Sequence, residues 1–348
     1  MMKGLILCAG RGTRLQPLSF TQPKTFLPVA NKPVLLHCIE KLVEIGIVEI
    51  GIVINKKHES LFKQKLGASK EIGAKITYIY QLEQKGIADA VKQAECFIDN
   101  DSFLLLLGDS LISDSLEGLK NTMADEDLSC SIMLSRVEKP EDYGIATIEG
   151  NKIVELEEKP KNPKSNLAII GAYAFTPEIF HAIHSISPSA RGEYEMTDAI
   201  QRLINHGAKI SYTITDQPYS DVGTVDRWLK ANQWMLDKIT KNNVIISKKS
   251  SCINCKFIPP VIIGDDCKLN NSTIGPYVSI TSGVIIENCH IENSILLDKT
   301  KLEKLPQTVK DSVFGQFTEV KGFAGGGHSK FILGEKSVVD LKREGDQE

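Results

Sequence analysis

The most constraining feature of this chain is a regular spacing of aliphatic residues after residue 245. Seven of them follow one another at intervals of five or six residues: Ile263, Leu269, Ile274, Ile280, Ile286, Ile291 and Leu297. A helix buries residues at intervals of three and four, so this period excludes an amphipathic helix. A period of about six residues with short turns is typical of a parallel β-helix, in which each repeat forms one side of a coil. A generic all-β region is the alternative, and the regularity over seven positions favours the β-helix.

The first two thirds of the chain follow another pattern, in which strand-like apolar runs alternate with helical ones. The expected strands are residues 4–7, 49–54, 75–80, 103–107, 130–135 and 169–175, and the expected helices are 34–45, 59–66 and 87–97. The run 103–107 is apolar on both faces, as in a central parallel strand. This alternation predicts a layered α/β sheet with right-handed crossovers. Ligands of such sheets bind beyond the carboxyl ends of the strands.

Length, charge and cysteine content narrow the classes of function. The 348 residues predict two domains. A formal net charge of −3 without long runs of one sign argues against nucleic acid or a membrane surface as the main partner. The first strand lacks a signal-peptide cleavage site, and no apolar run could span a bilayer, so a cytoplasmic location is expected. Cys8 and Cys96 are expected in apolar surroundings, and the lone C-x-x-C pair of Cys252 and Cys255 indicates reduced thiols rather than zinc.

The loop after the first strand combines glycine with fixed positive charge. It reads "AGRGTRLQPLSFTQPK" from residue 9 to residue 24. Gly10 and Gly12 allow the backbone to turn sharply and approach a phosphate, and Arg11 and Arg14 are shaped for phosphate oxygens. The loop has neither the Walker A spacing nor the dinucleotide fingerprint. Taken alone, these residues leave a solvated surface loop as the alternative.

Motifs along nearly the whole chain resemble those of the sugar-1-phosphate nucleotidyltransferases. They are "GRGTRL…PK…LPVANKP", "YQLEQKGIADAV", "LLGDS", "DYGIA", "ELEEKP", "GAYAF", "RGEYEMTDAI" and "SDVGT". The chain is most similar to the long-form glucose-1-phosphate thymidylyltransferases, which carry a C-terminal left-handed β-helix. The resemblance implies a Rossmann-like α/β catalytic domain of the GT-A type at residues 1–242, a left-handed β-helix of hexapeptide repeats at 243–342 and a polar tail at 343–348.

The activity that the resemblance implies is transfer of a nucleotidyl group from a nucleoside triphosphate to a sugar 1-phosphate, with release of pyrophosphate. The first expectation is dTTP with glucose 1-phosphate, and UTP or CTP is the alternative. By resemblance, Arg14 holds the β- and γ-phosphates, Lys24 lies against the α-phosphate, and Asp109 and Asp221 carry Mg²⁺. An in-line displacement depends on positioning and charge neutralisation, which these residue types supply. The alternatives for the two aspartates are a strand-end turn and an ordinary loop carboxylate.

The other motif residues are expected at the two substrates. By resemblance, the nucleotide-binding set is Leu7, Ala9, Gly10, Gly12, Thr13, Gln81, Gly86 and Asp109, and the sugar-phosphate-binding set is Tyr143, Gly144, Glu158, Lys159, Tyr173 and Arg191. Gln81 has a donor and an acceptor for a pyrimidine edge, and Glu158 accepts hydrogen bonds from hydroxyls. The alternative for these residues is that they end a strand, belong to a turn or pack in the core. Thr197 and Asp198 are expected to cap a helix rather than to touch a ligand.

Three positions depart from the pattern of the thymidylyltransferases. Thr25 stands where they carry glutamine after the lysine, and its hydroxyl is too short to span both edges of a thymine. This departure bears on the choice of base. Ser110 replaces the asparagine after the "GD" aspartate, and Tyr219 replaces a tryptophan beside Asp221.

Two rival functions come from other classes. One is a bifunctional enzyme whose β-helix is an acetyltransferase, and this chemistry requires a catalytic histidine in the coils. His290 and His328 are the candidates there, and neither lies in a cluster of site-like residues. The other is a regulatory subunit that binds sugar nucleotides, against which the intact Arg14, Lys24 and Asp109 argue. β-helix domains often assemble, so a homo-oligomer, with a trimer first, is expected.

Overall fold

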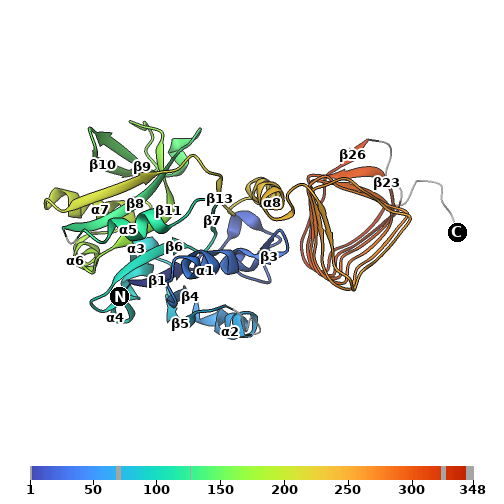
Figure 1. The fold of residues 1–348 in the computed structure, drawn as a ribbon, viewed down its shortest axis with the longest axis horizontal. Coiled ribbons are helices and arrows are strands. Elements are labelled where there is room, and N and C mark those ends of the chain that lie inside the picture. The colour runs from blue at the N-terminus through green and yellow to red at the C-terminus, as the bar shows by residue number, and fades with distance from the viewer. Residues whose placement is uncertain (1, 68–71, 126, 323–326, 342–348) are drawn as a thin grey trace. The chain divides into compact units, whose positions relative to one another are not determined.

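The computed structural model describes residues 2–67, 72–125, 127–322 and 327–341 (Figure 1). The chain forms two compact units. Unit 1 comprises Met1–Gly10 and Leu35–Tyr219, and unit 2 comprises Arg11–Val34 and Ser220–Glu348. The loop after the first strand therefore packs with the C-terminal third of the chain. The domain boundary at residue 242 stays a prediction, and the tail at 343–348 lies outside the described residues.

Unit 1 is built on a mixed sheet. Among the described residues it has nine strands, which are β1 (Met2–Leu7), β4 (Glu49–Ile54), β5 (Lys75–Tyr80), β6 (Ser102–Leu107), β8 (Leu128–Arg136), β9 (Gly144–Glu149), β10 (Lys152–Glu158), β11 (Leu167–Phe175) and β12 (Lys209–Ile214). The main path runs β10-β9-β11-β6-β1-β4-β5, and β8 pairs with β11 and β12. Strands β5, β4, β1 and β6 are parallel neighbours, so their carboxyl ends meet at one edge of the sheet.

Helices cover both faces of this sheet. They are α1 (Val34–Glu44), α2 (Glu59–Gly67), α3 (Ile87–Lys92), α4 (Glu95–Ile98), α5 (Glu117–Thr122), α6 (Glu178–Ser185) and α7 (Met196–Asn205), with short 3-10 helices at Lys56–His58 and Pro140–Asp142 and a short strand β7 (Ser110–Ile112). On one face, α1 comes so close to β1 that a Cβ added to Gly4 would lie 2.7 Å from Leu42. On the opposite face, Phe97 comes within 2.8 Å of the corresponding position of Gly51 on β4. The buried side chains of α3, α4, α6 and α7 share one core with the sheet.

The structure corrects three expectations for unit 1. Strand β6 is parallel to β1 but antiparallel to β11, so it lies where a parallel half of the sheet meets an antiparallel half. The helix expected at residues 87–97 is two short helices, α3 and α4, because the chain turns at Ala94. Cys96 lies on α4 and is exposed, whereas Cys8 is buried as expected.

Unit 2 contains a parallel β-helix. Its strands are β14 (Val244–Ile246), β15 (Ser251–Ile253), β16 (Lys256–Phe257), β17 (Val261–Ile263), β18 (Lys268–Asn270), β19 (Thr273–Ile274), β20 (Val278–Ile280), β21 (Ile285–Glu292), β22 (Ser294–Leu296), β23 (Lys301–Lys310), β24 (Val313–Phe314), β25 (Glu319–Gly322), β26 (His328–Ser329), β27 (Ile332–Leu333) and β28 (Val338–Leu341). Figure 1 shows them stacked in successive coils. Partners on the face β14-β17-β20-β22-β24-β27 are 16 to 19 residues apart, about three six-residue repeats per coil.

The spacing of aliphatic residues predicts most of the interior of these coils. All seven residues named from the sequence are buried, with at most 3% of their surface exposed. Six of them belong to the apolar core of the coils, whereas the expectation for Leu297 is off by one residue, because Leu296 occupies the position equivalent to Ile280. The handedness of the β-helix stays a prediction.

Unit 2 also holds the loop after the first strand and one long helix. The loop contains two 3-10 helices, Thr13–Leu15 and Lys24–Phe26, and a hairpin of β2 (Pro28–Val29) and β3 (Lys32–Pro33). Strand β13 (Tyr219–Asp221) leads to α8 (Val225–Thr240), which the Thr224 side chain caps by accepting a hydrogen bond from the Arg227 N–H. No helix in the described part of the chain is long and apolar enough to cross a membrane.

Candidate active site

The predicted site residues of unit 2 lie in the loop and just before α8. Gly12 has a φ of 65°, a conformation that favours glycine, and begins the 3-10 helix that contains Thr13 and Arg14. A Cβ added to Gly12 would lie 3.3 Å from Cβ of Lys24, so the two ends of the loop are in contact. The Ser19 hydroxyl closes the turn by donating to the Gly12 carbonyl at 2.7 Å. These two contacts place Lys24 beside the glycine turn.

Arg14 and Asp221 meet at a second glycine. A Cβ added to Gly223 would lie 3.2 Å from Oδ2 of Asp221 and 3.3 Å from Nη2 of Arg14. Asp221 also accepts two hydrogen bonds from Nη1 of Arg227, at 2.9 and 2.8 Å. The structure therefore brings one carboxylate and two guanidinium groups together around Gly223, where an added Cβ would require the Asp221 and Arg14 side chains to shift by a few tenths of an ångström. Sequence reasoning missed Arg227, because nothing in a spacing of six residues marks an ion pair.

In unit 1, Asp109 directly follows the strand β6, as expected for a residue beyond the carboxyl end of a parallel strand. Its charge is felt by the buried Cys38 thiol of α1, whose pKa is raised by burial first and by Asp109 second. The Cys38 thiol donates to the Ser110 carbonyl at 3.4 Å, and Ser110 itself is buried. Gly108 donates to the Leu7 carbonyl at 2.9 Å, which joins the ends of β6 and β1.

The nucleotide-binding residues predicted in unit 1 lie in two neighbouring segments. Gln81, 4% exposed at the end of β5, donates through Nε2 to the Gly86 carbonyl at 3.2 Å and to Asp89 Oδ2 at 2.7 Å. Gln84, which sequence reasoning missed, donates to the carbonyl of Ala9. Gly10 follows Ala9 and is exposed. The segment after β5 is therefore joined to the segment after β1, as a shared substrate site at the edge of the sheet requires.

Gly86 is held in a conformation that is essentially restricted to glycine. Its φ is 109° and its ψ 177°. A Cβ there would lie 2.5 Å from the Tyr194 carbonyl oxygen and 2.7 Å from the Tyr194 nitrogen. Tyr194 is fixed in turn, because its N–H donates to the Lys85 carbonyl at 2.7 Å and its carbonyl accepts from the Ala88 N–H at 3.1 Å. The start of α3 is thereby tied to the segment that precedes α7.

The predicted sugar-side residues form one cluster around Glu158. Gly144 pairs with Glu158 in the β9–β10 hairpin, and a Cβ added to Gly144 would lie 3.0 Å from Oε2 of Glu158. The Thr197 hydroxyl donates to the same carboxylate at 3.4 Å, and Nη1 of Arg191 donates to it at 3.3 Å. Burial raises the pKa of Glu158, and the neighbouring charge of Glu195 raises it further. The Glu158 carboxylate is thus a hydrogen-bond acceptor held in a fixed position, and Gly144 has no side chain to fill the space beside it.

Three more predicted residues border this cluster. Lys159 has a φ of 47°, and its N–H donates to the Tyr143 carbonyl at 2.9 Å, so the two segments are in register. Tyr173 is 5% exposed and stacks on Phe175 at 5.7 Å between ring centroids, as a core residue does. Burial raises the pKa of the Tyr173 hydroxyl, and the charge of Glu158 raises it further.

Arg191 is surrounded by carboxylates. It pairs with Glu158, Glu193 and Glu195 at 3.3, 3.2 and 3.6 Å. Glu195 is 3% exposed and also accepts from the Ser189 hydroxyl at 2.8 Å, a role that sequence reasoning missed. The expectation that Thr197 and Asp198 cap a helix is wrong. Helix α7 begins at Met196 after Glu195, and the Thr197 hydroxyl turns to Glu158 instead.

A metal ion bound at the predicted site would have few protein ligands. Among the described residues, no three or more His, Cys, Asp and Glu side chains group together as a ligand set. Asp109 and Asp221 nevertheless have the chemistry that Mg²⁺ prefers, which is one or two carboxylates supplemented by water and substrate phosphates. The Asp221 carboxylate is held in place by its ion pair with Arg227 at 2.8 Å. Asp109 belongs to unit 1 and Asp221 to unit 2, and each carboxylate by itself fits such an ion when water and phosphate oxygens complete its shell.

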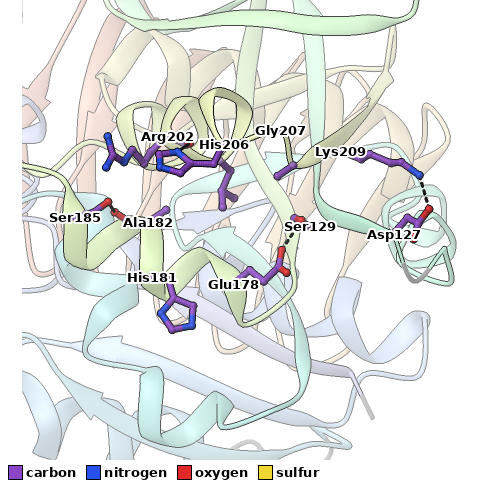
Figure 2. A pocket seen from close by; sticks show the side chains of 12 residues that line it. Asp127, Ser129, Glu178, His181, Ala182, Ser185, Arg202, His206, Gly207 and Lys209 are labelled. Carbon is purple, nitrogen blue, oxygen red and sulfur yellow. Dashed lines mark hydrogen bonds and ion pairs between the residues drawn. The ribbon is translucent and has the colours of Figure 1, made fainter.

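A cavity of about 660 Å³ lies elsewhere on unit 1, between α6, α7 and the start of β12 (Figure 2). None of the predicted site residues lines it. Its acidic residues are engaged, since Asp127 pairs with Lys209 and Glu178 accepts from the Ser129 hydroxyl. Size alone does not identify a site, and the chemistry described above lies in other parts of the unit.

Comparison with known proteins agrees with this geometry. The model of the family described as nucleotidyl transferase matches residues 3–238. A glucose-1-phosphate thymidylyltransferase from Streptomyces antibioticus is 32% identical over 357 residues, covering 98% of this chain and 100% of the relative. A UTP–glucose-1-phosphate uridylyltransferase from Haloferax volcanii is 36% identical over 243 residues, covering 69% of this chain and 99% of the relative.

Solved structures give the same answer. The structure of a UDP-glucose pyrophosphorylase complexed with UDP-glucose is 26% identical, has a TM-score of 0.61, and covers 68% of this chain and 100% of the other. The match of the family model over most of unit 1, together with a relative of equal length, identifies the family. The chain therefore belongs to the nucleotidyl transferase family and is a sugar-1-phosphate nucleotidyltransferase.

Proposed function

We propose that this enzyme joins dTTP to glucose 1-phosphate, giving dTDP-glucose and pyrophosphate with the help of Mg²⁺. The observation that carries the proposal is the meeting of Arg14, Asp221 and Arg227 around Gly223. A triphosphate needs cationic groups and a metal-binding carboxylate held in fixed positions, and this arrangement offers both. The full-length relative from Streptomyces antibioticus supports the choice of dTTP and glucose 1-phosphate.

The proposed reaction is a single in-line displacement. An oxygen of the sugar phosphate forms a bond to the α-phosphorus while the bond to the pyrophosphate oxygen breaks, so no covalent enzyme intermediate is required. Arg14 binds the β- and γ-phosphates of the leaving group. Lys24 contacts the α-phosphate and stabilises the charge that develops there. When bound by Asp109 and Asp221, Mg²⁺ supplies charge neutralisation at the phosphates.

The two substrates call on different residues. Gln81 and the backbone of Leu7, Ala9, Gly10, Gly12, Thr13 and Gly86 form the nucleotide-binding set. On the sugar side, Glu158 accepts from hydroxyl groups over the space that Gly144 leaves, and Lys159 binds the phosphate. The sugar is lined by Tyr143 and Tyr173, and Arg191 contacts the phosphate or orders the loop that carries it.

UTP is the second candidate for the nucleotide, and one observation favours it. Thr25 is 1% exposed, and its hydroxyl has no hydrogen-bond partner among the residues that the structure describes. A buried short side chain does not provide the amide of the glutamine that thymidylyltransferases carry at this place. The uridylyltransferase relative from Haloferax volcanii gives the same candidate independent support.

The test is pyrophosphate release by the purified enzyme with glucose 1-phosphate and each of dTTP, UTP, CTP, GTP and ATP. We expect release with dTTP, its loss on chelation and its return with Mg²⁺. Lys24→Ala and Arg14→Ala should lower kcat/KM by about 100-fold or more, because each removes charge stabilisation in the transition state. Lys248→Ala, at an exposed lysine of unit 2, is the matched control and should leave the rate unchanged. Release mainly with UTP would overturn the choice of base, and no release with any nucleotide would overturn the reaction.

A further inference from the structure

One face of the β-helix is apolar on its outside as well as its inside. The outward residues of β14, β17, β20, β22, β24 and β27 form one row: Ile245, Ile262, Ser279, Ile295, Val313 and Ile332. At the middle of the row, Ser279, Ile295 and Val313 are at most 1% exposed. Outward residues on a β-helix are buried only where another element covers them. This face is therefore a docking surface within unit 2.

The phosphate loop, Arg11–Val34, is one of the elements that cover this face. Asn31 Nδ2 donates to the Ile280 carbonyl at 2.6 Å. Farther along, a Cβ added to Gly334 would lie 3.0 Å from Pro17, and the Thr21 side chain hydrogen-bonds to Glu335. These contacts join three places in the loop to coils of the β-helix.

Helix α8 is the second covering element, and Asn232 lies at its middle. Asn232 is fully buried, and its Oδ1 accepts two hydrogen bonds of 2.8 Å, one from the Ala30 N–H and one from the Ser279 hydroxyl. Ser279 is the one polar residue of the outward row. The same oxygen therefore joins the loop, the helix and the β-helix.

The remaining half of the Asn232 amide carries a cost. Its Nδ2 is buried with no hydrogen-bond partner in the described part of the chain. An unpaired buried donor is unfavourable, and a leucine of similar size would avoid it. The two bonds accepted by Oδ1 are thus the feature that an apolar side chain could not replace.

Asn232 acts close to the residues that bind phosphate. Ala30 lies in the β2–β3 turn with a φ of 48°, and the Trp228 indole of α8 donates to the Pro28 carbonyl at 2.7 Å. Lys24 begins the 3-10 helix that leads directly into this hairpin. At the same, N-terminal end of α8, the segment before the helix holds Asp221 beside Arg14.

We propose that Asn232 is a positioning residue for nucleotidyl transfer, which fixes the loop bearing Arg14 and Lys24 onto the β-helix through Ala30 and Ser279. This inference rests on the proposed role of the loop in binding the triphosphate. The β-helix is then a support for catalysis and not only a means of assembly. The backbone hydrogen bonds within the loop are confined mostly to short local turns, so anchors such as Asn232 fix how the loop as a whole is held.

The test compares full-length Asn232→Leu with Gln233→Leu. Gln233 lies on the same helix and also reaches the β-helix, by donating to Asn293 at 2.8 Å, and the described residues show no hydrogen bond between Gln233 and the loop. We expect Asn232→Leu to lower kcat/KM for the nucleotide by about 10- to 100-fold, as misplacement of a reacting group does, with KM for the sugar phosphate within about twofold. Gln233→Leu should match the wild type. Equal effects of the two substitutions would refute a specific role for Asn232.

Ser279 provides a second route if Asn232→Leu does not fold. Ser279→Ala should lower the same kcat/KM, and Ser279→Thr, which keeps the hydroxyl, should restore it. Amide hydrogen exchange of residues 11–34 gives a readout that does not need activity, and it should be faster in Ser279→Ala and Asn232→Leu. An inactive wild type would contradict the proposed function without affecting this measurement. Unchanged exchange in the loop would overturn the positioning role.

Discussion

Gly86 offers a sharp test of how tightly the segment between β5 and α3 is packed. Gly86→Ala places a Cβ at a φ of 109° and ψ of 177°, a region that costs a non-glycine residue about 1–3 kcal/mol. The same Cβ would lie 2.5 Å from the Tyr194 carbonyl oxygen. This atom belongs to the backbone, so it cannot turn away as a flexible side chain can. Overpacking of this kind adds about 1–3 kcal/mol.

The expected destabilisation of Gly86→Ala is therefore about 2–6 kcal/mol. For a unit of this size it corresponds to a fall in Tm on the order of 10 °C in thermal unfolding followed by circular dichroism. The strain also falls on the segment after β5, which Gln84 joins to Ala9 after β1. KM for the nucleotide should consequently rise even at temperatures where the variant is folded.

Gly150→Ala is the matched control. Gly150 also has a positive φ, of 60°, but no atom lies within 4 Å of the added Cβ. The control measures backbone strain alone, about 1–2 kcal/mol. If Gly86→Ala is no less stable than Gly150→Ala, the contact with Tyr194 is not a constraint and the argument fails.

Two further predictions concern charge and thiols. Burial raises the pKa of Glu158, so the stability that this side chain contributes is complete below the ordinary pKa of 4.5 and is lost as the pH rises through the raised pKa. The Tm of Glu158→Gln relative to that of the wild type should therefore increase as the pH rises from 4 to 8. A difference in Tm that stays constant across that range would contradict the assignment. Among the cysteines, exposed Cys96 should react first with a thiol reagent at pH 8, while the buried thiol of Cys289, whose pKa burial raises to about 11, should react only on unfolding. Peptide mapping by mass spectrometry decides the second point, and early labelling of Cys289 would disprove it.

Local patterns predicted the elements of the fold well, because burial on one side leaves a period in the sequence. The strands β4 and β5 match their expected ranges, and the aliphatic spacing located the interior of the β-helix. Failures occur where pairing partners are distant in the chain. The apolar run of β6 is compatible with parallel or antiparallel neighbours, so its pairing with β11 was not predictable.

The candidate site was predictable to a similar degree. The resemblance named Gly144, Glu158 and Tyr173 separately, and the structure brings them into one cluster. The residues that were missed, Arg227 and Glu195 above all, act through ion pairs whose partners have no fixed spacing. The misassigned Thr197 shows the same limit, because a helix-capping residue and a side chain that turns to a distant carboxylate look alike in sequence.

The outward residues of the β-helix also carry information about packing, in addition to the period of the inward residues. A free-standing β-helix would carry polar residues at Ile262, Ile295 and Val313, because outward positions meet water. Their apolar character indicates a covered face, and the structure identifies the loop and α8 as elements that cover it. The loop that carries Arg14 and Lys24 has only short local turns of its own, and the β-helix gives it an external support. In the sequence the β-helix looks like a separate domain added after the first, but in the fold it packs against that loop and supports it.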